Sequence, residues 1–532
     1  MELIIVCGCL LLALALFIFI ININFRAAYF FYKIPKLHWV IHFFVFRKKA
    51  YLKETELFLP HSIMPIIDDM GWSEGSDLRK KGGPSRLITD RGPTIEDYAN
   101  VVEIGRQAGV RIPGMFVISD FDQAGVCALP EYNMPIRESN LTEQELSWKN
   151  STPLEYNQKI MDYLGENSEY LEIGLHGVRH EHFHEGTFQN AEWADGTTGE
   201  SWGAENTKLH CEAFEKILRQ YFSPEECSFP KSFVPPSHAF AYHSEDARIL
   251  NEYGIKYMCC SCKSRPSMKF LQNTGIFKDG VLMLDRTELV GVHKTAHVPK
   301  SLTANAWIGT HFPNYWGNSI KKWVRFLRNI NQNYDTMLGR NTVYNNSQWI
   351  YNHYTASQLQ GAQITLNNLH MPQWVYDNGM ANGIWLKAHL HSKQHISQVE
   401  LEELTLGAYY EDENDNAYVY LLNNNEANGA LERKLYQGRY TLGTEKPQGT
   451  YVDIGRETFT VKGLRDDGKA IRLSLEVYGK HVVKLHTKQK ISQAVCNHSH
   501  VKEITVSEHQ IQMVLQAGNR MGETVELVLE YC

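Results

Sequence analysis

Residues 64–72 read MPIIDDMGW, an apolar run that ends in two adjacent carboxylates and then a turn. The run predicts a buried strand with Asp68 and Asp69 at its carboxyl end, which is where barrel active sites form. Because neighbouring carboxylates repel each other, a buried pair is favourable mainly when a cation or a proton relieves the repulsion. We therefore interpret the pair as part of a site, with an ordinary turn or helix cap as the alternative.

A second apolar run, residues 170–182 (YLEIGLHGVRHEH), stops at a cluster of histidines. A helix beginning at Gly177 would place His176 and His180 on one side, where each imidazole can give a nitrogen to one metal at about 2.0 to 2.1 Å. For a His-x-x-x-His pair alone, surface histidines are the alternative. Because this pair follows a strand and is matched by the Asp-Asp strand end, we expect the two segments to share a cation.

Three further segments carry polar or aromatic residues of interest. Residues 229–238 (FPKSFVPPSH) predict a strand that leads into a rigid Pro-Pro rim. Residues 306–310 predict a strand that ends at His311, a candidate acid. Glu192 and Trp193 lie in a Gly-rich loop, where solvated loop residues are the favoured interpretation and support of the site is the alternative.

Up to about residue 320 the chain alternates short apolar runs with helical patterns, which predicts a parallel α/β core. A barrel of strand-helix units matches this alternation best. In residues 123–152 and 329–392 the apolar periodicity weakens, which predicts long loops or insertions. The predicted strands are 63–67, 114–119, 171–175, 232–234 and 257–259, and the predicted helices are 95–108, 154–164, 207–221 and 244–253.

From about residue 399 the pattern changes to short alternating runs separated by Asn, Gly and Asp clusters. This pattern predicts a separate antiparallel β-sandwich without a catalytic cluster, and therefore an accessory domain. We expect a membrane anchor and interfacial segment at residues 1–50, a barrel with insertions at 51–395 and the sandwich at 396–532.

Residues 3–22 carry no charge and are about long enough to cross a bilayer as a helix. Only Met1 and Glu2 precede the run and bulky residues follow it, which favours an uncleaved single-pass anchor over a cleaved signal. Residues 37–46 fit an interfacial segment, with a buried amphipathic helix as the alternative. The formal net charge of -7, without a long run of one sign, argues against a nucleic-acid partner.

Three motifs, IDD at 67–69, HGVRH at 176–180 and FVPP at 233–236, resemble in order and spacing those of the polysaccharide deacetylase superfamily. The resemblance covers residues 60–320 or so. The chain looks closest to a divergent branch of carbohydrate esterase family 4 that has His-Gly-x-x-His. This resemblance implies an incomplete (β/α) barrel with a divalent metal, zinc by its ligand types, at the mouth.

The resemblance also implies roles for individual residues. Asp69, His176 and His180 would hold the metal, Asp68 would be the general base and His311 the acid. The metal would polarise an acetyl carbonyl and lower the pKa of water, while Asp68 takes the proton. The residues implied to contact the substrate are Trp72, Pro236, Ser237 and His238.

The chain departs from the family pattern at two places. Phe233 stands at about the position of an arginine that usually pairs with the base, and Arg179 and Arg286 are the candidates to replace that arginine. His311 follows Gly309-Thr310 instead of the usual Leu-x, and His293 and His297 are the alternatives for the acid.

The function implied is hydrolysis of an acetyl group, mainly the N-acetyl of a hexosamine, on a surface polysaccharide or its lipid-linked precursor. O-deacetylation uses the same machinery. The alternatives are a membrane-tethered, non-catalytic carbohydrate-binding protein and a glycoside hydrolase, which uses two carboxylates and no metal. A carbohydrate substrate favours the outer side of a membrane, whereas the basic residues after the anchor favour the cytoplasmic side, so the side stays open.

Overall fold

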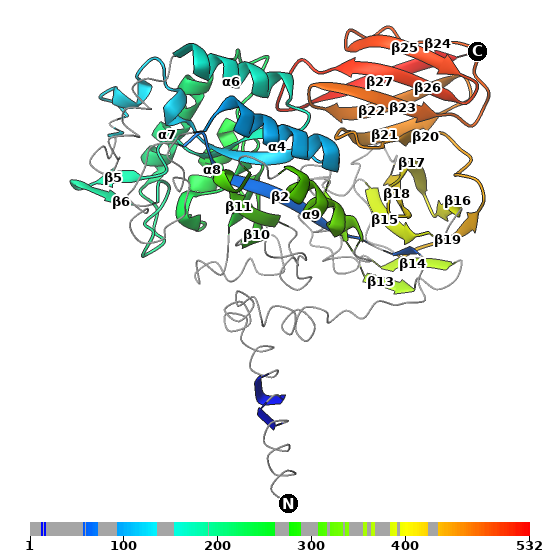
Figure 1. Cartoon of the computed structure of the whole chain (residues 1–532), viewed down its shortest axis with the longest axis horizontal. Coiled ribbons are helices and arrows are strands. Elements are labelled where there is room, and N and C mark those ends of the chain that lie inside the picture. Colours follow the sequence, from blue (N-terminus) through cyan, green and yellow to red (C-terminus); the bar gives the residue numbers. More distant parts are fainter. Residues whose placement is uncertain are drawn as a thin grey trace, which may run out of the picture.

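The structure is a computed structural model. The residues that it describes are 12–13, 15–17, 57–58, 60–72, 93–132, 134–135, 154–189, 191–260, 276–288, 307–315, 320–332, 336–339, 355–358, 363–367, 383–390, 394–423 and 435–531. They form a parallel α/β unit and a set of mainly antiparallel sheets that lies beside it (Figure 1).

The α/β unit is built on parallel strands whose pairings return to their starting point. Along the ladder each strand pairs in parallel with the next, and β11 pairs again with β2, from Trp307 opposite Met64 to His311 opposite Asp68. The carboxyl ends of all these strands therefore lie on one side of the unit. The predicted incomplete barrel itself stays a prediction. The ladder strands are β2 (His61–Met70), β3 (Ile112–Val117), β4 (Leu171–Gly177), β7 (Ser232–Phe233), β8 (Tyr257–Cys260), β10 (Val281–Glu288) and β11 (Trp307–His311).

Burial explains why these segments are strands. Every residue of β3 and of β4 is buried, as expected for a parallel sheet that is covered on both faces. Two short strands extend the sheet: β12 (Thr336–Leu338) pairs with the start of β2, and β9 (Ile276–Lys278) pairs antiparallel with β10. The predicted strand segments are confirmed, with ends that shift by a few residues.

Helices connect and cover the strands (Figure 1). Helix α4 (Ile95–Ala108) begins at a capping box formed by Thr94 and Asp97 and ends at Gly109, which takes the left-handed conformation that glycine adopts at low cost. The helices predicted from periodicity are confirmed. The others are α6 (Leu154–Glu166), α7 (Ala204–Leu218), α8 (Asp246–Tyr253) and α9 (Ile320–Gln332), with 3₁₀ turns η3 (Ile118–Phe121), η4 (Val126–Ala128), η6 (Pro236–His238) and η10 (Phe312–Tyr315).

The remaining strands form a larger and a smaller sheet, antiparallel except that β17 pairs in parallel with β20. Apolar side chains of both sheets share one buried cluster. The predicted sandwich stays a prediction. The larger sheet contains β1 (Leu57–Phe58), β13 (Thr355–Gln358), β14 (Gln363–Asn367), β15 (Gly383–His389), β16 (His395–Leu401), β17 (Leu404–Glu411), β18 (Asn416–Asn423), β19 (Leu435–Gly443), β20 (Tyr451–Asp453), β23 (Lys480–His486), β25 (Val501–Ser507) and β26 (Gln510–Gln516), and the smaller sheet contains β21 (Thr460–Asp466), β22 (Ala470–Val477), β24 (Ala494–Val495) and β27 (Glu523–Tyr531).

Some strands that precede residue 396 belong to the larger sheet instead of the α/β unit. β1 pairs with β15, β15 pairs with β18, and β14 pairs with β19. The prediction of long loops over residues 329–392 is therefore wrong where the structure describes strands there. The boundary at residue 396 stays a prediction.

Most of the predicted anchor, residues 3–22, and all of residues 37–46 lie outside the described residues. Among the helices that the structure describes, none combines the length and the apolar character needed to cross a membrane.

The buried side chain of Arg111 joins the α/β unit to the antiparallel sheets. Arg111, just before β3, pairs with Glu172 near the start of β4. The Arg111 guanidinium also donates to the backbone carbonyl of Arg520 at 3.1 Å and lies 4.1 Å from the centre of the Tyr478 ring. Both partners of the pair are buried, so this contact fixes the amino-terminal ends of the strands against the antiparallel sheets.

A buried carboxyl group at the same junction makes stability depend on pH. The Thr458 hydroxyl donates to the backbone carbonyl of Glu169 at 2.5 Å. Burial raises the pKa of the Glu169 side chain from 4.5 to about 7, and the charge of Glu457 adds to the rise. Between pH 4.5 and about 7 the folded protein keeps a proton on Glu169 that the unfolded chain has lost. The free energy of unfolding therefore falls as the pH rises through this range.

We expect Glu169→Gln to remove this dependence and to raise the free energy of unfolding at pH 8 by about 2 kcal/mol, because the amide carries no charge to bury. Urea unfolding at pH 5 and pH 8 measures the effect. Glu166→Gln, at an exposed position three residues earlier, is the control and is expected to leave the difference between the two pH values unchanged. A Glu169→Gln profile equal to that of the wild type would contradict the prediction.

Candidate metal centre

The adjacent aspartates lie at the carboxyl end of β2, as predicted. Successive side chains of a regular strand point to opposite faces. Here the pairing of β2 with β3 shifts register between Ile67 and Met70, and Asp69 has a φ of 59° in the left-handed region. A bulge of this kind redirects a side chain. Asp68 and Asp69 can therefore face different partners within one site.

Asp69 meets the two predicted histidines. Its Oδ1 atom is 3.3 Å from Nε2 of His176 and 3.6 Å from Nε2 of His180, and the three residues are 2 to 6% exposed. The ligand atoms all lie within 4.8 Å of one another, so this buried group could bind a metal ion. Two ligands of a tetrahedral metal, each about 2.1 Å from it, are about 3.4 Å apart. The donor set and its spacing fit a divalent cation.

His180 reaches the site by a turn and not by a helix. β4 continues to Gly177, residues 178–181 form a bend, and His180 has a φ of 68°. The prediction of a helix from Gly177 is therefore wrong, although the two rings do converge, with centroids 5.2 Å apart. The left-handed backbone at His180 turns its ring back toward His176.

The environment of His176 prepares its Nε2 atom for a metal. Its Nδ1 donates to the backbone carbonyl of Val234 at 2.5 Å, so Nε2 is the nitrogen that faces Asp69 and would bind a metal. Burial lowers the pKa of His176, but the hydrogen bond with Asp69 and the charges of Asp68 and Asp69 outweigh burial and raise the pKa overall. The ring is therefore fixed and lies in a negative field, which attracts a cation.

Arg286, one of the two candidate arginines, pairs with Asp68. Its Nη1 donates to Oδ1 of Asp68 at 2.9 Å, and its Nη2 donates to Oδ2. The guanidinium is 1% exposed and comes from β10, 218 residues away in the chain. A Cβ at Gly309 would lie 2.7 Å from Cζ of Arg286. Glycine at 309 thus leaves room for the arginine from β10.

His311 lies beside the metal centre. It ends β11, opposite Asp68, and its Nε2 is 3.8 Å from Oδ2 of Asp69. Its side chain is 35% exposed and therefore open to solvent, unlike the buried side chains of Asp69, His176 and His180. The alternatives His293 and His297 lie outside the described residues.

The residues predicted to contact substrate line the same end of the strands. Trp72 is buried and stacks on His180 at 3.9 Å, and Pro236 is buried in η6. Ser237 and His238 both have left-handed backbone, with φ of 53° and 55°. Nε2 of His238 lies 3.4 Å from Nη2 of Arg286. Their contact with a substrate stays a prediction.

Backbone strain gathers at this site. Asp69, His180, Ser237 and His238 all have positive φ, which costs a non-glycine residue about 1 to 3 kcal/mol. The surrounding contacts must offset that cost. Such clustering is typical of functional sites.

Glu192 and Trp193 lie beside the candidate metal ligands, a place that the sequence analysis gave only as the alternative. Glu192 and Trp193 are both 0% exposed, so the interpretation as solvated loop residues is wrong. Glu192 contacts the backbone of the His180 turn, and the Trp193 indole donates to the backbone carbonyl of His176 at 2.8 Å. An acidic residue followed by tryptophan after a histidine cluster was the available signal, but the sequence does not indicate burial.

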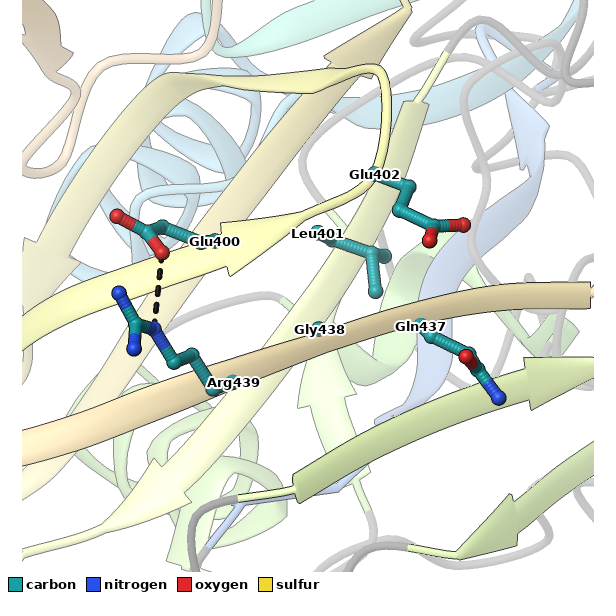
Figure 2. Close-up of a pocket in the computed structure, with 6 residues that line it drawn as sticks. All are labelled: Glu400, Leu401, Glu402, Gln437, Gly438 and Arg439. Atoms are coloured by element: carbon teal, nitrogen blue, oxygen red, sulfur yellow. Dashed lines mark hydrogen bonds and ion pairs between the residues drawn. The ribbon is translucent and has the colours of Figure 1, made fainter.

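Two pockets lined by described residues lie away from this centre. Figure 2 shows one of about 460 Å³ between β16 and β19, in which Arg439 donates to Glu400 at 3.0 Å. A neighbouring cleft of about 810 Å³ shares Glu400 and extends to Lys488. Neither contains a predicted site residue, and both side chains of the Glu400–Arg439 pair are more than half exposed. These surfaces lack the buried, converging groups of the metal centre.

The chain was also compared with known proteins. No family model, curated protein or solved structure matches it. Any function inferred for the protein therefore depends on the geometry of the candidate metal centre and on the sequence motifs that predicted it.

Proposed function

We propose that the protein is a metal-dependent deacetylase that removes acetyl groups from a carbohydrate. The observation that carries the proposal is that two adjacent carboxylates have different partners. Asp69 faces His176 and His180, whereas Asp68 is held by Arg286. One carboxylate thus belongs to a cation site and its neighbour is available for proton transfer, which is what hydrolysis at a metal requires.

The donor set suits zinc, which accepts two imidazole nitrogens and a carboxylate oxygen and keeps further positions for water and substrate. When bound, such an ion supplies a Lewis acid that polarises the acetyl carbonyl and lowers the pKa of water. A set of three protein ligands is typical of catalytic sites, since structural zinc sites usually have four.

Two residues of the chain carry out the two proton transfers. Asp68 accepts the proton of the attacking water, and Arg286 holds the carboxylate in orientation through two hydrogen bonds. As the bond between the carbonyl carbon and the amine breaks, His311 gives a proton to the departing nitrogen. The products are acetate and a free amine.

The substrate in this proposal is an N-acetylhexosamine of a surface polysaccharide or of its lipid-linked precursor. An O-acetyl group would follow the same steps with an alcohol as leaving group. The apolar run at residues 3–22 would tether the enzyme to a membrane next to such a substrate. The resemblance of the motifs to polysaccharide deacetylases supports this substrate class.

The test is acetate release from N-acetylated and O-acetylated oligosaccharides by the full chain, before and after removal of metal. We expect chelation to reduce acetate release to background and added zinc to restore it, because the metal site is needed for the attack on the carbonyl. Acetate is measured directly and chain length is followed in parallel.

Three results would contradict the proposal. Acetate release that is insensitive to chelation would exclude the metal mechanism. Cleavage of the chain without acetate would indicate a glycoside hydrolase. Zinc and glycan binding without acetate release would indicate a carbohydrate-binding protein.

A further inference from the structure

Glu192 binds the backbone of the turn that carries His180. Its carboxylate accepts hydrogen bonds from three successive backbone N–H groups: from Val178 at 2.7 Å, from Arg179 at 3.2 Å and from His180 at 2.6 Å. Successive N–H groups next to a left-handed residue form a concave nest for an anion. Here the anion is a side chain of the protein, and the left-handed residue is a metal-binding histidine.

The carboxylate has a fixed place on its other side as well. His210, from α7, donates through Nδ1 to Oε1 of Glu192 at 2.5 Å, and both side chains are buried. At Gly177 a Cβ would lie 1.9 Å from Oε2 of Glu192. The chain therefore has glycine directly before the turn, where any side chain would displace the carboxylate.

Trp193, the residue after Glu192, holds the backbone at His176, the other candidate metal ligand. The indole of Trp193 donates to the backbone carbonyl of His176 at 2.8 Å. Its ring packs edge-on against Phe233 at 5.1 Å and against His210 at 5.7 Å. Two consecutive residues of one loop thus hold the backbone at both metal-binding histidines.

We propose that Glu192 is a positioning residue of the metal centre, which holds the left-handed turn at His180 so that its Nε2 faces Asp69. This inference rests on the proposed metal-dependent function. The left-handed backbone at His180 is strained, and hydrogen bonds to a charged acceptor are strong enough to offset that strain. Without the carboxylate the turn relaxes, and the His180 ring leaves the position at which a cation is shared.

Zinc affinity distinguishes positioning from a purely structural role. The probe is zinc alone, titrated into metal-free full chain, with Glu192→Gln compared to Glu172→Gln. Glu172 is a matched control because it is also buried, lies on the same strand as His176, and is held by Arg111 and by the Tyr257 hydroxyl at 2.8 Å. We expect Glu192→Gln to weaken zinc binding about 10- to 100-fold and Glu172→Gln to leave it within about threefold, although both lower thermal stability.

A second variant and a second measurement address the case in which Glu192→Gln does not fold. Gly177→Ala keeps every charge but pushes the carboxylate out of the nest, so it should weaken zinc binding in the same way. Hydrogen exchange in the metal-free protein reports the nest directly. We expect the amides of residues 178–180 to exchange at least about tenfold faster in either variant.

The outcomes separate this inference from the proposed function. Unchanged zinc affinity in Glu192→Gln and Gly177→Ala would overturn the positioning role, even if wild-type protein releases acetate. An equal loss in Glu172→Gln would also overturn it, because general destabilisation would then explain the effect. If zinc binding depends on Glu192 but the wild type releases no acetate, the positioning role holds and the deacetylase proposal fails.

Discussion

Asp68→Asn is expected to lower the rate of acetate release about a thousandfold while the protein keeps its zinc. General acid-base groups contribute about 10²- to 10⁴-fold to hydrolytic rates, and an amide accepts no proton from water. Asn has nearly the same shape, and Asp68 is not one of the residues that meet at the cation position. Steady-state acetate release together with metal analysis of the same samples measures both quantities.

Asp69→Asn is the matched control, because it changes the neighbouring carboxylate in the same way. Asp69 belongs to the metal-binding group, so we expect its variant to lose zinc as well as activity. An Asp68→Asn protein that works within about threefold of the wild-type rate would show that Asp68 is not the base. Loss of zinc in Asp68→Asn would show that the two carboxylates do not have separate roles.

The second large effect is expected for Arg286→Met, which leaves the Asp68 carboxylate buried without its partner. Breaking a buried ion pair from one side costs about 3 to 5 kcal/mol, since the remaining charge is neither solvated nor paired. We expect urea unfolding to show a loss of this size. The rate of acetate release per folded molecule should fall about tenfold or more, because the base is no longer held in orientation.

Arg111→Met provides the matched control for Arg286→Met. The Arg111–Glu172 pair is buried to a similar degree but lies at the opposite ends of the parallel strands. We expect a similar loss of stability with little change in rate per folded molecule. Gly309→Ala, whose Cβ would lie 2.7 Å from Arg286, should reproduce part of the loss of rate while keeping all charges. Equal rates per folded molecule in Arg286→Met and Arg111→Met would contradict the orienting role of Arg286.

Local patterns in the sequence were sufficient for the first half of the site. The apolar run before Asp68 and Asp69 predicted β2, and the run before His176 predicted β4, because buried parallel strands are nearly continuous in apolar residues. These two strand ends predicted a shared cation, and the resemblance to polysaccharide deacetylases implied that Asp69, rather than Asp68, would join the two histidines. The helix expected at Gly177 was wrong, because a spacing of four residues fits a tight left-handed turn as well as it fits a helix.

The other half of the site depends on contacts that local patterns do not encode. Arg286 reaches Asp68 from 218 residues away, and its space depends on a glycine in another strand. Glu192 is a charged residue in a loop, and only the fold reveals that backbone N–H groups surround it. In the same way, nothing in residues 355–358 or 363–367 indicated membership of the larger sheet, since their neighbours come from distant parts of the chain.

The course of the chain between the two units has a consequence for ancestry. β1 precedes the aspartate-bearing strand yet pairs with β15 in the larger sheet, while β13 to β15 enter that sheet after the last strand of the α/β unit. No single cut in the gene would therefore separate the two units completely, because β1 would stay attached to the α/β unit, or the α/β unit itself would be divided or would stay attached to the rest of the larger sheet. We expect the two units to be inherited, duplicated and lost as a single genetic block, unlike accessory domains that are exchanged by recombination at a linker.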